Sequence, residues 1–169
     1  MMKVWKFIQA VGITGFLICL FIMYMTNLGV RGIRKYDPSF QSPDMQLHYS
    51  ATSITDTFEK IGANGRAIYR KYLFLDCAFT LFFLIVMVTI ASSLFTETLA
   101  RNLMFAICIF RAIFDILENS LLLIILRNYP VINKPLITIC SAFTTIKFVL
   151  LYIWILALIL LGFQKLKSV

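Results

Sequence analysis

The chain has 169 residues, of which 60% are hydrophobic and only 14% are charged, and its formal net charge at pH 7 is +8. A soluble domain is about half apolar and about a quarter charged, so this composition excludes an ordinary soluble domain. Four blocks reach the roughly 20 apolar residues that a membrane helix needs: residues 4–26, 72–95, 103–126 and 136–162. We therefore expect an all-α, polytopic membrane protein, an antiparallel four-helix transmembrane bundle forming one domain over residues 1–169.

The first block, residues 4–26, is expected to be a membrane span and not a signal peptide. Its apolar run exceeds the roughly 7–15 residues of a signal peptide's hydrophobic region. No A-x-A-like cleavage site follows in "YMTNLGVRG". Four spans place both termini on one side of the membrane, here named side A. The loops 27–71 and 127–135 then lie on the opposite side, named side B.

Basic residues are more numerous on side B. Side A carries five of them: Lys3, Lys6, Arg101, Lys165 and Lys167. Side B carries nine: Arg31, Arg34, Lys35, Lys60, Arg66, Arg70, Lys71, Arg127 and Lys134. The positive-inside rule favours a cytoplasmic side B, although the first span is flanked almost evenly, so both orientations stay open. We expect these charges to meet anionic lipid headgroups, in a plasma, inner or organelle membrane, and to bind no nucleic acid.

The long loop 27–71 contains a predicted amphipathic helix over residues 53–61. Ser53 and Asp56 fit the S-x-x-[DE] capping box, and the apolar residues that follow at helical spacing are Ile54, Phe58 and Ile61. Gly62 is expected to end this helix. Its moderate length and apolar stripe predict that it lies on the membrane surface.

The end of the same loop supports two interpretations. The pair "NG" at residues 64–65 predicts a turn, and Arg66 is expected to begin the helix that continues into the second span. Tyr69 would then lie at headgroup depth, where tyrosine rings are favoured. The segment is either a simple elbow at the membrane surface or a lid over a cavity, with Arg66 and Tyr69 pointing into it.

Motifs for metals and cofactors are missing from the sequence. The four cysteines, Cys19, Cys77, Cys108 and Cys140, fall one in each span and form no CxxC pair, so we interpret them as small hydrophobic residues. His48 is the only histidine. No nucleotide-binding or hydrolase fingerprint is present. We therefore expect no metal and no cofactor.

Five ionisable residues lie within the predicted spans: Asp76, Arg111, Asp115, Glu118 and Lys147. Each would cost roughly 2.5–3.5 kcal/mol at the bilayer centre. Together they would cost on the order of 12–17 kcal/mol if they faced lipid, which is comparable to the stability of a whole domain. They must therefore face the interior of the bundle and pair with one another.

Helical spacing indicates which residues can pair. Arg111, Asp115 and Glu118 follow at i, i+4 and i+7 and share one helix face, with Asn119 at its edge. In the fourth span, Thr144 and Lys147 share a face. We expect Glu118 and Asp115 to be balanced by Lys147 and Arg111. Asp76 is then left over, within reach of Arg66, Arg70 or water.

The polar residues lie at graded depths. At 1.5 Å per residue, Asp76 is about 6 Å from side B, Glu118 about 13 Å, Lys147 about 16 Å, Asp115 about 18 Å and Arg111 about 24 Å. No comparable series begins at side A. A cavity between the spans is therefore expected to open toward the long loop.

A series of short motifs resembles a family of small four-span integral membrane proteins of unestablished function. The motifs are "GANGRAIY" (62–69), "LDCAF" (75–79), "FDILEN" (114–119), "NYP" (128–130) and "TTIK" (144–147), preceded by "YS" at 49–50. The resemblance runs from about residue 49 to 150. It implies no activity, and only that these residues belong to one unit.

Three classes of function are compatible with this pattern. The first is a binding site or enzyme for a lipid or other amphiphile, with Asp115 and Glu118 as acid or base, Arg111 and Lys147 holding negative charge, and Asn119 orienting. The second is an accessory subunit or assembly factor of a larger membrane complex, or a homo-oligomer. The third is a small proton-coupled transporter. Whether the protein is an enzyme stays open.

Overall fold

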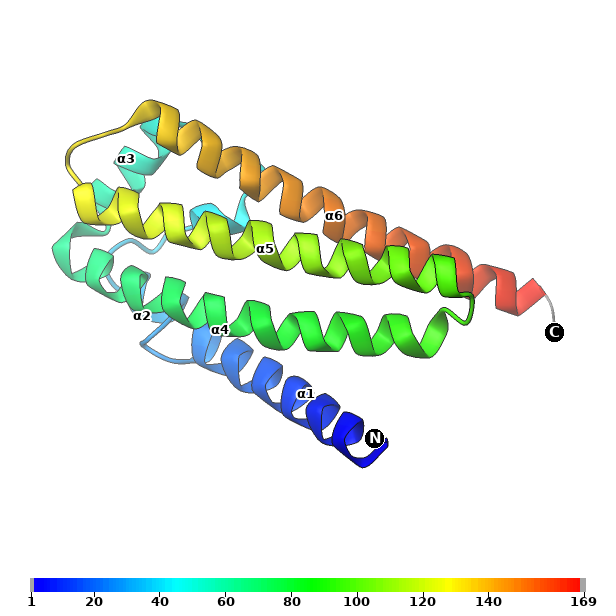
Figure 1. Cartoon of the computed structure of the whole chain (residues 1–169). Helices are drawn as coiled ribbons and strands as arrows, with labels where there is room; N and C mark the ends of the chain where they lie inside the picture. The colour runs from blue at the N-terminus through cyan, green and yellow to red at the C-terminus, as the bar shows by residue number, and fades with distance from the viewer. Residues whose placement is uncertain (1, 168–169) are drawn as a thin grey trace.

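Four long helices form the body of the protein. The computed structural model describes residues 2–167, and side chains over residues 3–161. The long helices are α1 (Met2–Met25), α4 (Gly62–Leu94), α5 (Thr98–Asn128) and α6 (Lys134–Lys167). Successive long helices run in opposite directions, and the part of the chain that is described contains helices and loops but no strand (Figure 1). The all-α prediction is confirmed.

Three of these helices, α1, α4 and α6, are long and apolar enough to cross a membrane. The remaining predicted span, residues 103–126, lies within α5, which has 31 residues. Its apolar sequence is interrupted by Arg111, Asp115 and Glu118, and this distinguishes it from the other three. The composition of α5 therefore fits a membrane helix only if its charged face is turned inward.

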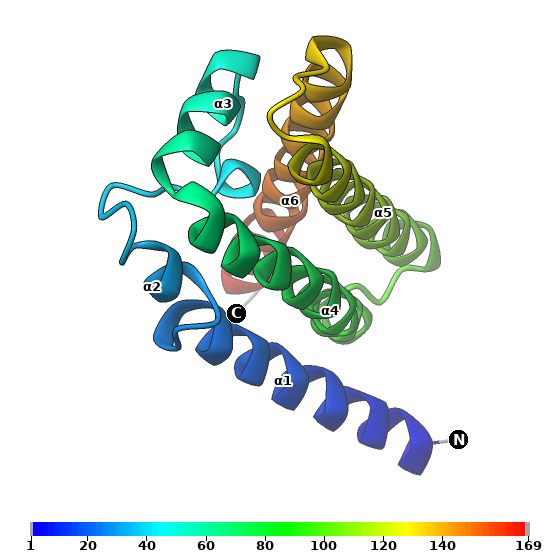
Figure 2. The same ribbon diagram turned by 90° about the vertical axis from the view of Figure 1, so that its left-hand side faces the viewer.

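The long helices pack in chain order. α1 packs on α4, α4 on α5, and α5 on α6, while α1 and α6 do not pack along their lengths. Viewed from the end that carries the loops, α1 lies on the far side of α4 from α5 (Figure 2). The bundle is therefore open between α1 and α6.

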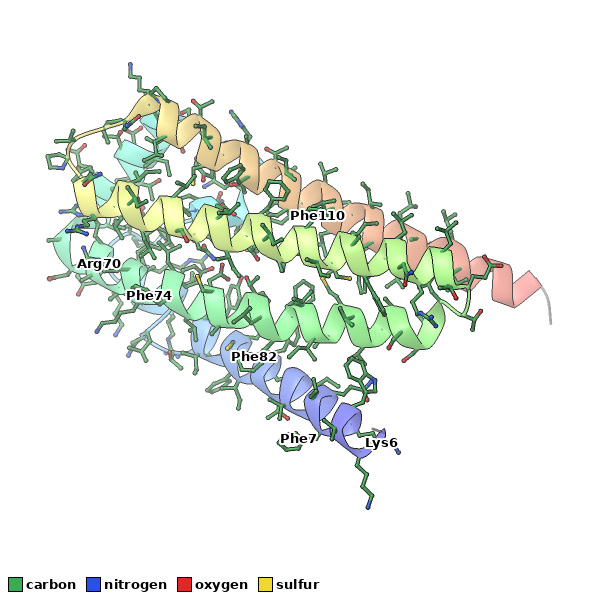
Figure 3. The ribbon with its side chains drawn as sticks, viewed as in Figure 1. Lys6, Phe7, Arg70, Phe74, Phe82 and Phe110 are labelled. Carbon is green, nitrogen blue, oxygen red and sulfur yellow. The ribbon has the colours of Figure 1, made fainter. Side chains whose placement is uncertain are left out.

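The outer surface of the bundle is apolar between two charged ends. Arg70 lies near the loop end and Lys6 near the opposite end, and Phe7 projects from α1 away from the other helices (Figure 3). The exposed residues between these ends include Leu17, Leu81, Ile113, Val149 and Leu156. Apolar side chains arranged in this way can face acyl chains at little cost.

Two glycines let α1 approach α4 closely. A Cβ atom at Gly12 would lie 2.4 Å from Cγ2 of Ile85, and one at Gly15 would lie 2.5 Å from the ring of Phe82. Small residues at such contacts are typical of helix pairs in membranes, where van der Waals packing drives association. The apolar first span is therefore a packed part of the fold.

The long loop is held against the bundle at the loop end. It contains the short helix α2 (Val30–Ile33), the 3-10 helix η1 (Pro43–Met45) and α3 (Ala51–Lys60). The backbone N–H of Tyr49 donates to Oγ of Ser141 on α6 at 3.0 Å, and Oγ1 of Thr145 donates to the carbonyl of Leu47 at 2.7 Å. The sequence patterns did not predict α2 and η1.

The short amphipathic helix is present, but its predicted cap is wrong. α3 begins at Ala51, and Oγ of Ser50 accepts the N–H of Ser53 at 3.1 Å. Ser50 is therefore the N-cap, three residues before the predicted one. Both serines fit the local preference for a hydroxyl at a helix start. Leu47 and Tyr49, just before the helix, are hydrogen-bonded to α6, and we infer that these contacts favour a helix start at Ser50.

Gly62 ends α3 as predicted, but the predicted turn at residues 64–65 is wrong. Gly62 has φ +63°, which side-chain-bearing residues adopt at a cost. α4 begins at this same residue, so residues 64–65 lie in its first turn. One left-handed residue is enough to redirect the chain, and no separate turn is needed.

Candidate functional site

Four ionisable side chains, Arg111, Asp115, Glu118 and Lys147, form one buried cluster, which we name the charged quartet. Nζ of Lys147 on α6 lies 2.8 Å from Oδ1 of Asp115 and 2.5 Å from Oε2 of Glu118, both on α5. Nη2 of Arg111 lies 2.8 Å from Oδ2 of Asp115, one helical turn away. The two cations and two carboxylates balance, so the quartet is neutral overall.

Two threonines complete the quartet. Oγ1 of Thr80 on α4 donates to Oδ2 of Asp115 at 2.7 Å, and Oγ1 of Thr144 on α6 donates to Oε1 of Glu118 at 2.5 Å. Three of the four carboxylate oxygens thus accept a hydrogen bond, and Oε2 of Glu118 is held by the ion pair with Lys147. Because a buried ion pair repays its desolvation only with such additional hydrogen bonds, the quartet can stabilise contacts among three helices.

Asp76 on α4 lies next to the quartet but does not join it. Its Oδ2 accepts a hydrogen bond from Nδ2 of Asn119 on α5 at 2.7 Å. No cation lies within 4.0 Å of Asp76 among the residues with described side chains, so neither Arg66 nor Arg70 pairs with it. Asp76 is the carboxylate left over by the charge count, as expected from the sequence.

A second carboxylate without a cation comes from the long loop. Asp44 in η1 is fully buried, and its Oδ1 accepts a hydrogen bond from the hydroxyl of Tyr69 at 3.0 Å, while its Oδ2 accepts one from Tyr72 at 3.2 Å. The hydroxyl of Ser42 also donates to Oδ1. Sequence reasoning missed Asp44, because no local pattern shows that a loop aspartate turns inward.

Tyr49 connects the loop to the quartet. Its hydroxyl donates to Sγ of Cys140 at 3.1 Å and lies 3.3 Å from Oγ1 of Thr144, whose own proton is donated to Glu118. Burial raises the pKa of the Tyr49 phenol well above its ordinary value, and the nearby Cys140 and Glu118 add to the effect. Tyr49 therefore stays protonated and acts as a neutral donor.

A cavity of about 230 Å³ lies beside these groups. Five ionisable residues line it: Asp44, Asp76, Arg111, Asp115 and Lys147. Its apolar wall includes Phe16 and Leu20 from α1, Phe79 and Phe83 from α4, and Phe148 and Leu151 from α6. The rings of Phe16, Phe79 and Phe83 stack on one another, with centroids 5.2–5.6 Å apart. The cavity thus combines an aromatic wall with a charged one.

The predicted lid residues do not line this cavity. Nη1 of Arg66 donates to the carbonyl of Phe58 at 2.7 Å, and the guanidinium lies 4.5 Å from the ring centroid of Tyr129. Arg66 therefore joins α3 to the end of α5. Tyr69 points inward but is covered by Asp44, to which it donates. At the loop end the cavity is lined by Asp44 and Met45 of η1.

The predicted cluster residues have two different positions relative to the cavity. Asp76, Arg111, Asp115 and Lys147 line it. Glu118 and Asn119 are fully buried behind them and act through Lys147 and Asp76 respectively. The structure therefore brings all six predicted residues together, but only four can touch a ligand.

Beyond Arg111 the core becomes apolar. Buried residues between this level and the ends of α4 and α5 opposite the loops are Met87, Ala91, Met104, Ile107, Cys108 and Trp154. The polar series therefore stops at about the level of Arg111, as expected from the sequence. Among the described residues, no group of three His, Cys, Asp or Glu side chains is placed to hold a metal ion.

Comparisons with protein-family models, with curated proteins and with solved structures give no match to this chain. The resemblance of its motifs to a family of small four-span membrane proteins is therefore not supported by these comparisons. The geometry of the cavity carries the functional argument alone.

Proposed function

We propose that the protein is a polytopic membrane protein whose buried cavity binds the polar group of a lipid or other amphiphile. In this proposal α5 crosses the membrane together with α1, α4 and α6. It is about 46 Å long at 1.5 Å per residue, which exceeds the hydrocarbon thickness of about 30 Å. It lies between α4 and α6, and its Arg111, Asp115 and Glu118 side chains are paired and buried. The short helix α3 then lies at the membrane surface, with its apolar residues turned toward the bundle.

The observation that carries this proposal is the cavity that combines charged groups with an aromatic wall. Ligand sites are typically concave and apolar with a few converging polar groups. Here Asp44, Asp76 and Arg111 supply the polar groups, and the phenylalanines of α1 and α4 supply the wall. A molecule with a polar head and an apolar tail matches both surfaces.

Access from the bilayer is favoured by the packing of the helices. The apolar wall includes residues of α1 and α6, and these two helices do not pack along each other. η1 lines the cavity at the loop end, through Asp44 and Met45. An amphiphile therefore reaches the cavity between α1 and α6, and its tail can extend between them into the bilayer.

The geometry supports binding more directly than acid–base catalysis. Asp115 and Glu118, the acid or base candidates, are each held by Lys147 and by a threonine hydroxyl. Glu118 does not line the cavity. A general acid or base must reach the proton that it transfers. We therefore assign Asp115, Glu118 and Lys147 a positioning role, and we propose ligand contacts at Asp44, Asp76 and Arg111.

Native mass spectrometry of the protein purified in a mild non-ionic detergent tests this proposal. The expected result is a retained amphiphile on the wild-type protein and its loss in Leu151→Trp, because Leu151 lines the cavity. Leu156→Trp is the matched control, because Leu156 is exposed on the same helix. Absence of any bound amphiphile from the wild type, or equal retention in both variants, would contradict the proposal.

A second candidate is a subunit of a larger membrane complex or a homo-oligomer. The observation that favours it is the neutrality of the quartet, which is also what a purely structural role requires. The same spectra test this candidate, because a stable partner or a second copy adds its mass. A proton-coupled transporter is disfavoured by the apolar core beyond Arg111.

A further inference from the structure

The two carboxylates outside the quartet bear on the charge of the ligand. Asp44 and Asp76 both line the cavity, and neither has a cation within 4.0 Å in the part of the chain with described side chains. The quartet offers no charge to balance them, because its own cations and carboxylates cancel. A buried carboxylate without a counter-ion is costly, so a bound cation would stabilise both.

Asp44 has hydrogen-bond donors but no cation within 4.0 Å among the described side chains. Its two oxygens accept from three neutral hydroxyls, those of Ser42, Tyr69 and Tyr72. Hydrogen bonds donated to a carboxylate favour its charged form. Three donors from two parts of the chain therefore converge on a carboxylate that has no positive partner.

Asp76 provides an independent, unpartnered acceptor. It is 5% exposed, and Asn119 occupies its Oδ2. Its Oδ1 makes no hydrogen bond to any residue with a described side chain, and the residue lines the cavity. Asp76 thus presents a buried acceptor to the space that a ligand would fill.

The aromatic wall suits a cation as well. Phe16, Phe79 and Phe83 stack beside Asp76 on the cavity surface, and Tyr24 contributes another ring. The faces of aromatic rings attract organic cations, and cages of such rings recognise ammonium groups. Carboxylates and ring faces together are the chemistry that holds an amine.

Arg111 bears on whether the ligand has a hydrogen-bond acceptor beside its amine. It is 6% exposed, and its Nε and Nη1 have no hydrogen-bond partner among the described side chains. Its guanidinium lies 4.6 Å from the ring centroid of Phe83, deeper than Asp76. These N–H groups can donate to a hydroxyl, ether or carbonyl oxygen next to the amine.

We propose that the cavity selects an amphiphile with a cationic amine head, which Asp44 and Asp76 bind between them while the tail leaves between α1 and α6. This inference rests on the proposed function and narrows it to one class of ligand. An amine held in this way gains charge-assisted contacts to two carboxylates in a cavity of low dielectric.

Competition among amphiphiles of one chain length tests the inference. The full-length protein in dodecyl maltoside is titrated with dodecyltrimethylammonium, dodecylamine and dodecyl phosphate, and occupancy is followed by native mass spectrometry. Tetramethylammonium, which has no tail, distinguishes an amphiphile from a free cation. The expected result is binding of the two dodecyl cations at least about tenfold tighter than that of dodecyl phosphate. Tetramethylammonium is expected not to compete.

Variants test whether Asp44 and Asp76 are responsible for the preference for cationic amphiphiles. Asp76→Asn and Asp44→Asn each remove one charge with little change in shape, and each is expected to weaken dodecylamine binding about tenfold, as expected for one charge-assisted contact. Asp56→Asn is the control, because Asp56 is exposed on α3 and makes the same change in net charge. Should Asp76→Asn fail to fold, Asp44→Asn and the headgroup preference of the wild type still decide the question.

The outcomes separate this inference from the proposed function. Equal or tighter binding of dodecyl phosphate, with binding lost in Leu151→Trp, overturns the amine preference and leaves the proposed function standing. An unchanged preference in both asparagine variants overturns the assignment to Asp44 and Asp76. Absence of binding by any dodecyl amphiphile overturns both proposals.

Discussion

The ammonium of Lys147 on α6 lies 2.5 Å from Oε2 of Glu118 on α5, and both side chains are at least 95% buried. Lys147 also contacts Asp115, so one cation from α6 neutralises charge at two levels of α5. Removing either partner leaves a buried charge uncompensated, whereas removing both leaves Arg111 and Asp115, whose charges cancel. Substitutions at Glu118 and Lys147 are therefore expected to be coupled in their effect on stability.

Glu118→Gln and Lys147→Met are each expected to lower the free energy of unfolding by about 3–5 kcal/mol, the usual cost of breaking a buried ion pair. The double variant is expected to lose less than the sum of the two single losses. Denaturant titration in detergent micelles measures all four proteins of the cycle. Additive losses would contradict direct coupling between Glu118 and Lys147.

Thr80→Val is expected to lower stability by about 1–3 kcal/mol, because it removes the hydroxyl that donates to Asp115 at 2.7 Å. Thr89→Val is a matched control on the same helix. Oγ1 of Thr89 is buried and has no hydrogen-bond partner among the described side chains, so its loss is expected to be neutral or stabilising. Similar midpoints of thermal unfolding for the two variants would exclude a role of Thr80 in holding Asp115.

Ser50→Ala is expected to cost about 1 kcal/mol, the typical value for loss of an N-cap. Ser53→Ala is expected to have a smaller effect, because the Ser53 hydroxyl does not cap α3. Comparing the two unfolding midpoints decides between the observed cap and the one that the capping-box pattern predicts. A larger loss for Ser53→Ala would favour the latter.

Gly62→Ala is expected to destabilise the protein by about 1–2 kcal/mol, because an alanine at φ +63° is strained. Gly62→Asn is expected to cost less, since asparagine tolerates the left-handed region better than alanine does. Nothing lies within 4 Å of a Cβ built at Gly62. The difference between the two variants therefore reports backbone strain and not crowding.

The cost of charge in a membrane predicted most of the cluster from sequence alone. By their spacing, Arg111, Asp115 and Glu118 share a helix face. Because buried charges must pair, the second carboxylate required another cation, and this pointed to Lys147. Asp76 was recognised as the unbalanced carboxylate for the same reason. These predictions succeeded because solvation energy and helix geometry act locally and leave few alternatives.

The loop could not be predicted in the same way. Asp44 is held by Tyr69 and Tyr72, which are 25 and 28 residues away in the sequence. The position of the α3 cap follows from the contact of Tyr49 with Ser141, across 92 residues. Interactions of this range leave no periodic pattern. The sequence therefore left open whether Arg66 belongs to an elbow at the membrane surface or to a lid.

Lipid accessibility along α5 tests whether this helix crosses the membrane with its charged face turned inward, because its crossing depends on paired charges. In a variant with Cys19, Cys77, Cys108 and Cys140 replaced by alanine, single cysteines at Ile113, Leu117, Ala112 and Leu122 are spin-labelled in lipid vesicles. Collisions with oxygen, which is concentrated in the bilayer, and with a water-soluble nickel complex are then measured. Ile113 and Leu117 are exposed on the outer face, whereas Ala112 and Leu122 are buried.

High oxygen and low nickel accessibility are expected at Ile113 and Leu117, and low accessibility to both reagents is expected at Ala112 and Leu122. Nickel accessibility at Ile113 and Leu117 equal to that of a loop position such as Val131 would show that α5 lies in water. Equal oxygen accessibility at all four positions would show that the charged face is not turned inward. Either result would contradict a buried, charge-lined cavity within the membrane.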